Sequence, residues 1–278
     1  KNVVENFVDE YISGRTPNPC VRCNSFIKWD TFIDQANNLG ADFIATGHYA
    51  QIIQKNNTFM ISKGIDNKKD QSYVLWGIPK ETLSKTILPL GDLTKEEVRN
   101  IARKYKLETA EEPESMEICF IADNNYKRFI NDYASTKVKD IGIGKTLNED
   151  GEKIGENDGY INYTIGQRKG IGISNKNPLY VKEINSEKNT ITVSEKKSLF
   201  NTKCKVSNIN WLIDDIELPL SAKCQIRYNG NGAIAVITKK NDEYFVEFNE
   251  PQLAITPGQS IVFFDNNLLL GGGIIEPI

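Results

Sequence analysis

The sequence predicts an α/β domain at the N-terminus, followed by a small β-rich central domain and a C-terminal β-barrel. Two patterns support this prediction. In the first part of the chain, apolar residues recur at helical spacing, and a short apolar run that suits a buried parallel strand follows them. From about residue 140 onward, short alternating runs are separated by Gly, Asn and Lys, as in barrel-like β modules. We place the domains at residues 1–135, 136–199 and 200–278.

Helical spacing begins at the start of the chain. We expect a helix over residues 3–12, with Gly14 as a stop signal, and a second helix over residues 29–39, capped by Gly40. The second helix carries its apolar residues on one face; they are Trp29, Phe32, Ile33, Ala36 and Leu39. Residues 42–46 follow as a short apolar strand, which is typical of a buried parallel sheet.

The rest of the chain shows further signals for helices and strands. Thr94 and Glu97 have the spacing of a capping box, which predicts that a helix starts there. A short helix is expected over residues 125–133. Alternating apolar residues predict four strands in the later part of the chain; they cover residues 179–181, 190–193, 233–237 and 244–248.

The composition is that of an ordinary globular protein, with 39% hydrophobic and 26% charged residues. No apolar run approaches the roughly 20 residues that span a bilayer, and no secretory signal precedes the first helix. We therefore expect a cytoplasmic protein without a membrane partner. The five cysteines are an odd number, which indicates reduced, catalytic or metal-binding thiols rather than a disulfide framework. Cys204 and Cys224 alternate with β residues, so we expect them to be buried small hydrophobes.

The distribution of charge leaves two interpretations open. The net charge of −3 argues weakly against a nucleic-acid partner, but residues 161–205 contain nine basic and only three acidic residues. A phosphate-binding face needs no more than such a local field. A solvated lysine-rich surface explains the same composition equally well.

A C-x-x-C motif formed by Cys20 and Cys23 is the most informative segment. It follows a loop stiffened by two prolines and precedes a helix. A helix N-terminus favours thiolate, and the neighbouring Arg15 and Arg22 should add to this effect, so we expect a lowered thiol pKa. Thiolate is the form that serves nucleophilic attack, sulfur transfer or metal ligation. The alternative is half of a zinc or iron–sulfur knuckle, for which a second pair of ligands would be expected nearby.

Three other segments combine residues that can carry chemistry. Residues 45–50 lie at the carboxyl end of the predicted parallel strand, where ligands of open α/β sheets bind; they include Gly47, which allows close backbone approach, and His48, the only histidine. Residues 68–73 place a cation, an acid and an amide side by side. Cys119 lies in a short β-like run, where a core cysteine is the default interpretation.

Five ordered motifs together resemble the tRNA-specific 2-thiouridylases, and the resemblance covers essentially the whole chain. One ordered set of five is far more specific than any single motif. In chain order they are residues 14–24 (GRTPNPCVRCN), 46–49 (TGHY), 69–73 (KDQSY), 115–120 (SMEICF) and 163–170 (YTIGQRKG).

The resemblance implies a fold and a reaction. It implies a PP-loop ATP-pyrophosphatase domain of the adenine nucleotide alpha hydrolase type, followed by central and C-terminal tRNA-binding domains. ATP, used with Mg, would adenylate the C2 oxygen of the wobble uridine in the tRNA anticodon loop, and a cysteine persulfide would then deliver sulfur to C2. A cysteine desulfurase or a sulfur-carrier protein would supply that sulfur.

The resemblance also implies roles for individual residues. Cys119 would carry the persulfide, and Cys23 would be the nucleophile that helps to release the sulfur, which ends in a Cys23–Cys119 disulfide. Gly47 would contact ATP. The positions that would contact tRNA are Asn18, Pro19, Cys20, His48, Lys69, Asp70, Gln71, Arg227, Tyr228 and Gln259. Arginine can bind phosphate and tyrosine can stack on an extruded base, which suits such contacts.

The sequence departs from the family pattern at three places. The family begins with a Ser-Gly-Gly-x-Asp-Ser loop that cradles the ATP phosphates, and this loop is missing here, so we expect an incomplete PP-loop domain that binds ATP poorly by itself. Cys20 stands where some members carry Asp, so Cys20, Cys23 and Cys119 could instead hold an iron–sulfur cluster that delivers sulfide. Residues 157–159 stand where a histidine-containing loop is common.

Two functions of other kinds are weighed against the sulfurtransferase. A non-catalytic RNA-binding fragment would need none of the three cysteines in the motifs. Another PP-loop enzyme, such as an argininosuccinate-synthase-like ligase, fits neither these thiols nor the β modules. The sequence therefore favours an enzyme that thiolates tRNA.

Overall fold

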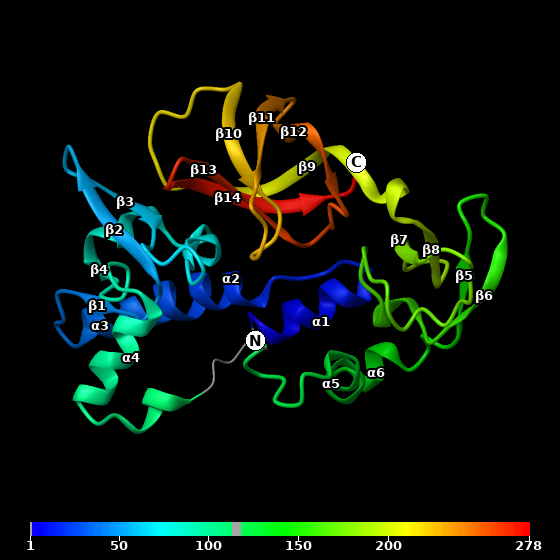
Figure 1. Cartoon of the computed structure of the whole chain (residues 1–278), viewed down its shortest axis with the longest axis horizontal. Helices are drawn as coiled ribbons and strands as arrows, with labels where there is room; N and C mark the ends of the chain where they lie inside the picture. Colours follow the sequence, from blue (N-terminus) through cyan, green and yellow to red (C-terminus); the bar gives the residue numbers. More distant parts are fainter. Residues whose placement is uncertain (1, 113–117) are drawn as a thin grey trace.

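The computed structural model describes residues 2–112 and 118–278 (Figure 1). The N-terminal region begins with helix α1 (Val4–Ile12), as predicted, and buries Phe7, Val8 and Tyr11. Gly14 follows with a φ of +74°, a conformation that favours glycine, and the chain turns away there. No helix in the described part of the chain is long and apolar enough to span a membrane.

The predicted second helix is present, but it starts at Pro19 rather than at Trp29. A continuous helical run is formed by α2 (Pro19–Cys23), the π-helical segment η1 (Asn24–Thr31) and α3 (Phe32–Asn38), and it ends at Gly40 with a φ of +72°. Of the apolar face read from the sequence, Trp29 and Ile33 are buried, whereas Phe32 and Leu39 are exposed. The π-helical turn explains this difference, because it changes the residue spacing within the helix and rotates the face.

The parallel strand predicted over residues 42–46 is present but covers only Ile44–Ala45, and it is buried only at Ile44, with Phe43 57% exposed. Strand β1 (Ile44–Ala45) pairs in parallel with β4 (Thr86–Ile87), and β2 (Ala50–Lys55) and β3 (Thr58–Lys63) form an antiparallel hairpin. Three short 3-10 helices and one α-helix connect these strands to the next domain. They are η2 (Ser72–Leu75), η3 (Lys80–Lys85), α4 (Lys95–Lys104) and η4 (Glu108–Glu111).

Helix α4 depends on its predicted capping box, because it buries no side chain. The Thr94 hydroxyl accepts a hydrogen bond from the Glu97 backbone N–H at 3.3 Å, and the Glu97 carboxylate accepts one from the Thr94 N–H at 2.7 Å. Thr94→Ala should therefore destabilise this helix by about 1 kcal/mol, measured as faster amide hydrogen exchange in its first turns. Thr109→Ala, at an exposed threonine of the adjacent η4, is the control and should leave exchange in α4 unchanged.

The central part of the chain combines two helices with a four-stranded sheet. The helices are α5 (Tyr126–Tyr133), as predicted, and α6 (Ser135–Val138). The strands occur in the order β6 (Lys153–Asn157), β5 (Gly144–Leu147), β8 (Thr190–Glu195) and β7 (Leu179–Asn185). The 3-10 helix η5 (Tyr160–Asn162) lies between β6 and β7, and η6 (Lys196–Leu199) leads from β8 to the C-terminal domain. Buried side chains of α1, α5, α6 and the sheet form one core; the domain limits at residues 135 and 199 stay predictions.

The predicted C-terminal barrel is confirmed and closed by six strands. They are β9 (Phe200–Trp211), β10 (Leu220–Gln225), β11 (Ala233–Lys240), β12 (Glu243–Leu253), β13 (Ser260–Asp265) and β14 (Leu268–Glu276). The order is β13-β10-β11-β12-β9-β14, and pairing of β13 with β14 closes the ring. Cys204 and Cys224 are each 1% exposed inside the barrel, which confirms that they are buried small hydrophobes.

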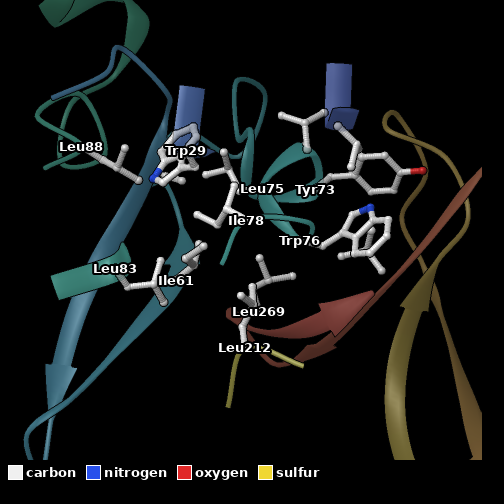
Figure 2. Packing of buried hydrophobic residues seen from close by; sticks show 14 of the residues in the cluster. Trp29, Ile61, Tyr73, Leu75, Trp76, Ile78, Leu83, Leu88, Leu212 and Leu269 are labelled. Carbon is white, nitrogen blue, oxygen red and sulfur yellow. The ribbon is translucent and has the colours of Figure 1, made fainter. Parts of the chain in front are cut away.

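The barrel and the N-terminal region share a hydrophobic core. Strand β3 pairs with β14 at Ser62 and Leu268, which attaches the β2–β3 hairpin to the barrel sheet. Figure 2 shows Leu212 and Leu269 of the barrel beside Leu75 and Ile78 of the N-terminal region, all in one buried cluster.

Within this shared core, the backbone of β14 lies directly against the Trp76 ring. A side chain at Gly272 of β14 would come within 2.7 Å of the Trp76 ring, so only glycine lets the indole lie against the strand. The Asn210 side-chain amide of β9 donates to the carbonyls of Trp76 and Ile78, each at 2.8 Å. The barrel is therefore part of the structure that carries the N-terminal motifs.

Candidate functional site

The cysteine loop, residues 13–18, leads directly into helix α2. The Asn18 side chain caps this helix by accepting a hydrogen bond from the Val21 N–H at 3.5 Å, and Pro19 is buried at the first helical position. Cys20 is exposed and Cys23 is half-buried, one helical turn further along. Asn18 and Pro19 thus fix the start of the helix that presents the two thiols.

The electrostatic surroundings of Cys20 differ from the prediction. Burial of the thiol raises its pKa, the neighbouring thiols of Cys119 and Cys23 raise it further, and Lys28 acts in the opposite direction. The expectation of a lowered pKa is therefore wrong for Cys20. Arg22 does not offset this effect, because its guanidinium is engaged elsewhere: it lies 4.7 Å from the centre of the Phe26 ring. Although part of the Cys20 residue is exposed to solvent, its sulfur is surrounded largely by protein atoms, and these raise the pKa of the thiol.

Cys119 lies in a turn rather than in a strand, and it is exposed, so the default interpretation as a core cysteine is wrong. The next residue, Phe120, is half-buried and packs against the core instead: its ring lies edge-on to Phe7 of α1, with the ring centres 5.4 Å apart. Ser115, the first residue of this predicted motif, lies outside the described residues. Since Cys119 and Cys23 both act on the pKa of Cys20, the structure brings the three predicted thiols together.

His48 is buried and held by two side chains. Its Nδ1 lies 2.8 Å from the Thr46 hydroxyl, its Nε2 lies 3.4 Å from the Lys28 ammonium, and its ring centre lies 5.4 Å from that of Trp29. Because an ammonium only donates, Nε2 accepts from Lys28, and the ring proton therefore sits on Nδ1 and is donated to Thr46. Burial lowers the pKa of His48 to about 4, with a further contribution from Lys28, so the ring is neutral at pH 7.

Lys28 is a site residue that the sequence did not reveal. It acts on both Cys20 and His48, and so it connects the thiols to the end of strand β1. The prediction began the second helix at Trp29, which left Lys28 outside it. A helix that starts at Pro19 would have placed Lys28 on the same helical run as both cysteines.

Gly47 lies exposed at the carboxyl end of β1, the place predicted for ligand binding in an α/β sheet. A side chain added at Gly47 would meet only Leu90, at 3.6 Å. The backbone at Gly47 is thus open on this side.

Asp70 and Gln71 organise the loop that follows the β2–β3 hairpin. The Asp70 carboxylate accepts hydrogen bonds from the Gly64 N–H at 3.1 Å and from the Ser72 hydroxyl at 2.7 Å. Gln71 pairs with the backbone of Tyr49 in both directions: its side-chain oxygen accepts at 3.0 Å and its N–H donates at 2.8 Å. The neighbouring Lys69 donates its N–H to the Asp66 carbonyl at 2.9 Å. These contacts attach the loop next to His48.

The three candidate residues of the barrel lie close to the cysteine loop. The Gln259 side-chain amide donates to the carbonyls of Thr16 at 3.0 Å and Pro17 at 2.9 Å. The ring of Tyr228 lies edge-on to Tyr73, with the centres 6.0 Å apart, and the Arg227 guanidinium donates to the Ala254 carbonyl at 3.1 Å. Asn18 and Tyr73 are also hydrogen-bonded to each other. Residues far apart in sequence are therefore brought to one place.

Two observations concern the remaining predictions. Four of the basic residues in the segment 161–205 form surface ion pairs with glutamates, which leaves both interpretations of that segment open; they are Lys182, Lys197, Lys203 and Lys205. No group of three or more His, Cys, Asp and Glu side chains among residues 2–112 and 118–278 is arranged to hold a metal ion.

The fold defines a class of protein with three parts. The chain matches the family models described as a tRNA methyl transferase HUP domain over residues 1–123, a tRNA methyl transferase PRC-barrel domain over residues 127–195, and an Aminomethyltransferase beta-barrel domain over residues 201–275. These matches agree with the α/β region, the central sheet and the six-stranded barrel.

Individual relatives specify the family. The tRNA-specific 2-thiouridylase MnmA of Carboxydothermus hydrogenoformans is 44% identical over 280 residues, which cover 99% of this chain and 76% of the relative. The MnmA of Natranaerobius thermophilus is 43% identical over 98% of this chain and 74% of the relative. The MnmA 2 of Clostridium tetani is 43% identical, with coverage of 99% and 77%. The chain belongs to the tRNA-specific 2-thiouridylase family, which confirms the resemblance read from the motifs.

Proposed function

We propose that this protein is a tRNA uridine 2-sulfurtransferase, which replaces the C2 oxygen of the wobble uridine by sulfur. The observation that carries the proposal is the group of three thiols near the carboxyl end of β1: Cys23 and Cys119 act electrostatically on Cys20, and Lys28 acts on Cys20 and contacts His48. A sulfur-transfer enzyme needs thiols beside its substrate site, whereas a protein that only binds RNA does not.

In this proposal, Cys119 and Cys23 carry out the sulfur transfer. A persulfide on Cys119, which is exposed and therefore accessible to a sulfur donor, attacks C2 of the activated uridine and displaces the leaving group. The Cys23 thiolate then attacks the Cys119 sulfur, the S–S bond of the persulfide breaks, and its outer sulfur stays on C2. This step leaves a Cys23–Cys119 disulfide, which a dithiol reductant resets.

ATP supplies the activation in this proposal by adenylating the C2 oxygen, with Mg as counter-ion. The HUP domain match supports the use of ATP, and the exposed backbone at Gly47 supports this residue as a contact. His48 would contribute a neutral ring at the base-binding end of the site, because its Nδ1 proton is already donated to Thr46.

An iron–sulfur cluster on Cys20, Cys23 and Cys119 fits less well. The three thiols are near enough to act on one another electrostatically, but among the described residues no three such side chains are arranged to hold a metal ion, so we assign no step to a cluster. Cys20 then acts as a wall of the uridine pocket together with Asn18 and Pro19, whose contacts shape the same helix start.

The tRNA would extend from this pocket across the barrel. Lys69, Asp70 and Gln71 belong to the loop that is bonded to the neighbour of His48. On the barrel side, Gln259 contacts the cysteine loop, Tyr228 packs against Tyr73, and Arg227 adjoins Tyr228 in the chain. A cysteine desulfurase or sulfur carrier would load Cys119. We place the protein in the cytoplasm, where its tRNA substrate is found.

The decisive experiment measures 2-thiouridine in cellular tRNA. Deletion of the gene should remove the wobble 2-thiouridine nucleoside from digested total tRNA, as detected by mass spectrometry, and the intact gene should restore it. A strain that keeps its 2-thiouridine level after deletion would rule out the proposal, provided that no second copy of the gene is present.

A further inference from the structure

Helix α1 holds only the start of the cysteine loop. The N–H groups of residues 13–15 donate to carbonyls of α1, whereas Pro17 has no backbone N–H to donate. The loop is followed at once by Cys20 and Cys23, whose placement relative to Cys119 decides whether sulfur can move between them. The contacts of residues 15–17 with the barrel therefore bear on where these two cysteines lie.

The barrel supplies contacts to the backbone of the loop. The Thr16 N–H donates to the Pro257 carbonyl at 2.9 Å, and the carbonyls of Thr16 and Pro17 accept from the Gln259 side chain. Between these two barrel residues, a side chain at Gly258 would come within 2.8 Å of the Thr16 carbonyl. The backbones of loop and barrel thus lie in direct contact, and every polar group of Thr16 on the main chain is bound to the barrel.

A partly buried ion pair adds a second attachment point. The Arg15 guanidinium binds both carboxylate oxygens of Glu276, at the end of β14, and donates to Glu10 of α1 at 2.6 Å. The Ser207 hydroxyl of β9 donates to the same Glu276 carboxylate at 2.5 Å. The Arg15 and Glu276 side chains are only 22% and 20% exposed, so solvent screens this pair weakly.

Backbone hydrogen bonds within the barrel connect the two attachment points. The Gly258 N–H donates to the Ile275 carbonyl at 2.9 Å, and the Ile275 N–H donates to the Gln259 carbonyl at 2.8 Å. Residues 258 and 259 are therefore connected to the strand that also carries Glu276. The contact with the Thr16 backbone and the ion pair with Arg15 are therefore linked to each other through β14.

We propose that the C-terminal barrel positions the reactive cysteines, with Glu276 and Gln259 as positioning residues that hold the cysteine loop and thereby set the distance of Cys20 and Cys23 from Cys119. The consequence for thiolation rests on the proposed function. The barrel then has a part in the chemical step in addition to any contact with tRNA, although none of its residues touches the reacting atoms.

Glu276→Gln in the full chain tests this proposal. The amide keeps the shape of the side chain but removes the charge and points a donor towards Arg15. We expect the turnover of thiolation to fall about 10-fold or more, because misplacement of reacting groups by about 1 Å costs up to about 100-fold, while KM for tRNA stays unchanged. In the free protein, alkylation of Cys20 and Cys23 by iodoacetamide should become several-fold faster, and diamide-induced disulfide formation with Cys119 should become slower.

The controls separate positioning from other effects. Glu247→Gln removes a different ion pair of the barrel, with Lys203, and should change neither thiol reactivity nor turnover. If Glu276→Gln does not fold, as judged by circular dichroism, Ser207→Ala gives the decision, because it removes one hydrogen bond to Glu276 and should shift the same thiol rates less strongly. Wild-type thiol rates in a folded variant would overturn the proposal. A wild-type protein that thiolates no tRNA would instead refute the proposed function, and the thiol rates would still decide on positioning.

Discussion

Replacing Cys119 by serine is expected to abolish thiolation, with a loss of at least about 1,000-fold in turnover, as is usual when a nucleophile is removed. The hydroxyl of serine cannot hold the transferable sulfur as a persulfide. Cys119 is exposed and lies in a turn, so the change should disturb no packing. Activity is measured as 2-thiouridine formed on tRNA, and binding as the Kd for tRNA, which should stay at the wild-type value.

The control for this prediction is a cysteine of the barrel core. Cys204→Ala removes a thiol that is 1% exposed in the core of the barrel, so it should lower stability without removing activity. Retained thiolation in Cys119→Ser would show that the sulfur travels by another route. Loss of both activity and tRNA binding would point to a structural role for Cys119 instead.

The second large effect concerns the protonation of His48. Because its pKa in the folded protein is about 4 and its ordinary value is 6.5, the unfolded chain takes up a proton on this ring at a pH where the folded chain does not. The stabilising contribution is therefore complete above pH 6.5 and is lost as the pH falls towards 4. It amounts to about 3 kcal/mol over that window.

NMR titration of the ring provides a direct measurement, since His48 is the only histidine. The expected midpoint is near pH 4. Lys28→Gln removes the ammonium 3.4 Å from Nε2 and should raise the pKa, although burial, the larger cause, keeps it below 6.5. His48→Gln should flatten the fall of stability between pH 6.5 and 4.5. A wild-type midpoint near 6.5 would contradict the buried, neutral ring.

Local signals in the sequence predicted the elements of the fold well. Gly14 and Gly40 marked helix ends correctly, the Thr94–Glu97 box started a helix, and alternating runs became barrel strands. All of these depend on residues a few positions apart, which is why one chain without coordinates could reveal them. The π-helical segment η1 is different, since no local signal marked the change of spacing that exposes Phe32.

The sequence predicted which residues gather at the site, but it did not predict the contacts between them. The motifs brought forward Cys20, Cys23 and Cys119, which do interact. The direction of the Cys20 pKa was wrong because burial and neighbouring thiols depend on the tertiary structure. The attachment of Thr16 to Gln259 joins residues more than two hundred positions apart, and no periodicity carries such a contact. The roles of the predicted site residues in binding ATP and tRNA stay predictions.

The core shared by the hairpin and the barrel has a consequence for how this architecture can be divided. A fragment ending before β9 would lose Leu212, Val262, Phe264 and Leu269 from the cluster around Trp76, and would leave that indole and its apolar neighbours facing water. Such a fragment would tend to self-associate rather than fold. The barrel therefore cannot be replaced by an unrelated barrel domain. A replacement would need a closed barrel and also a glycine at the position of Gly272, against which the Trp76 indole lies.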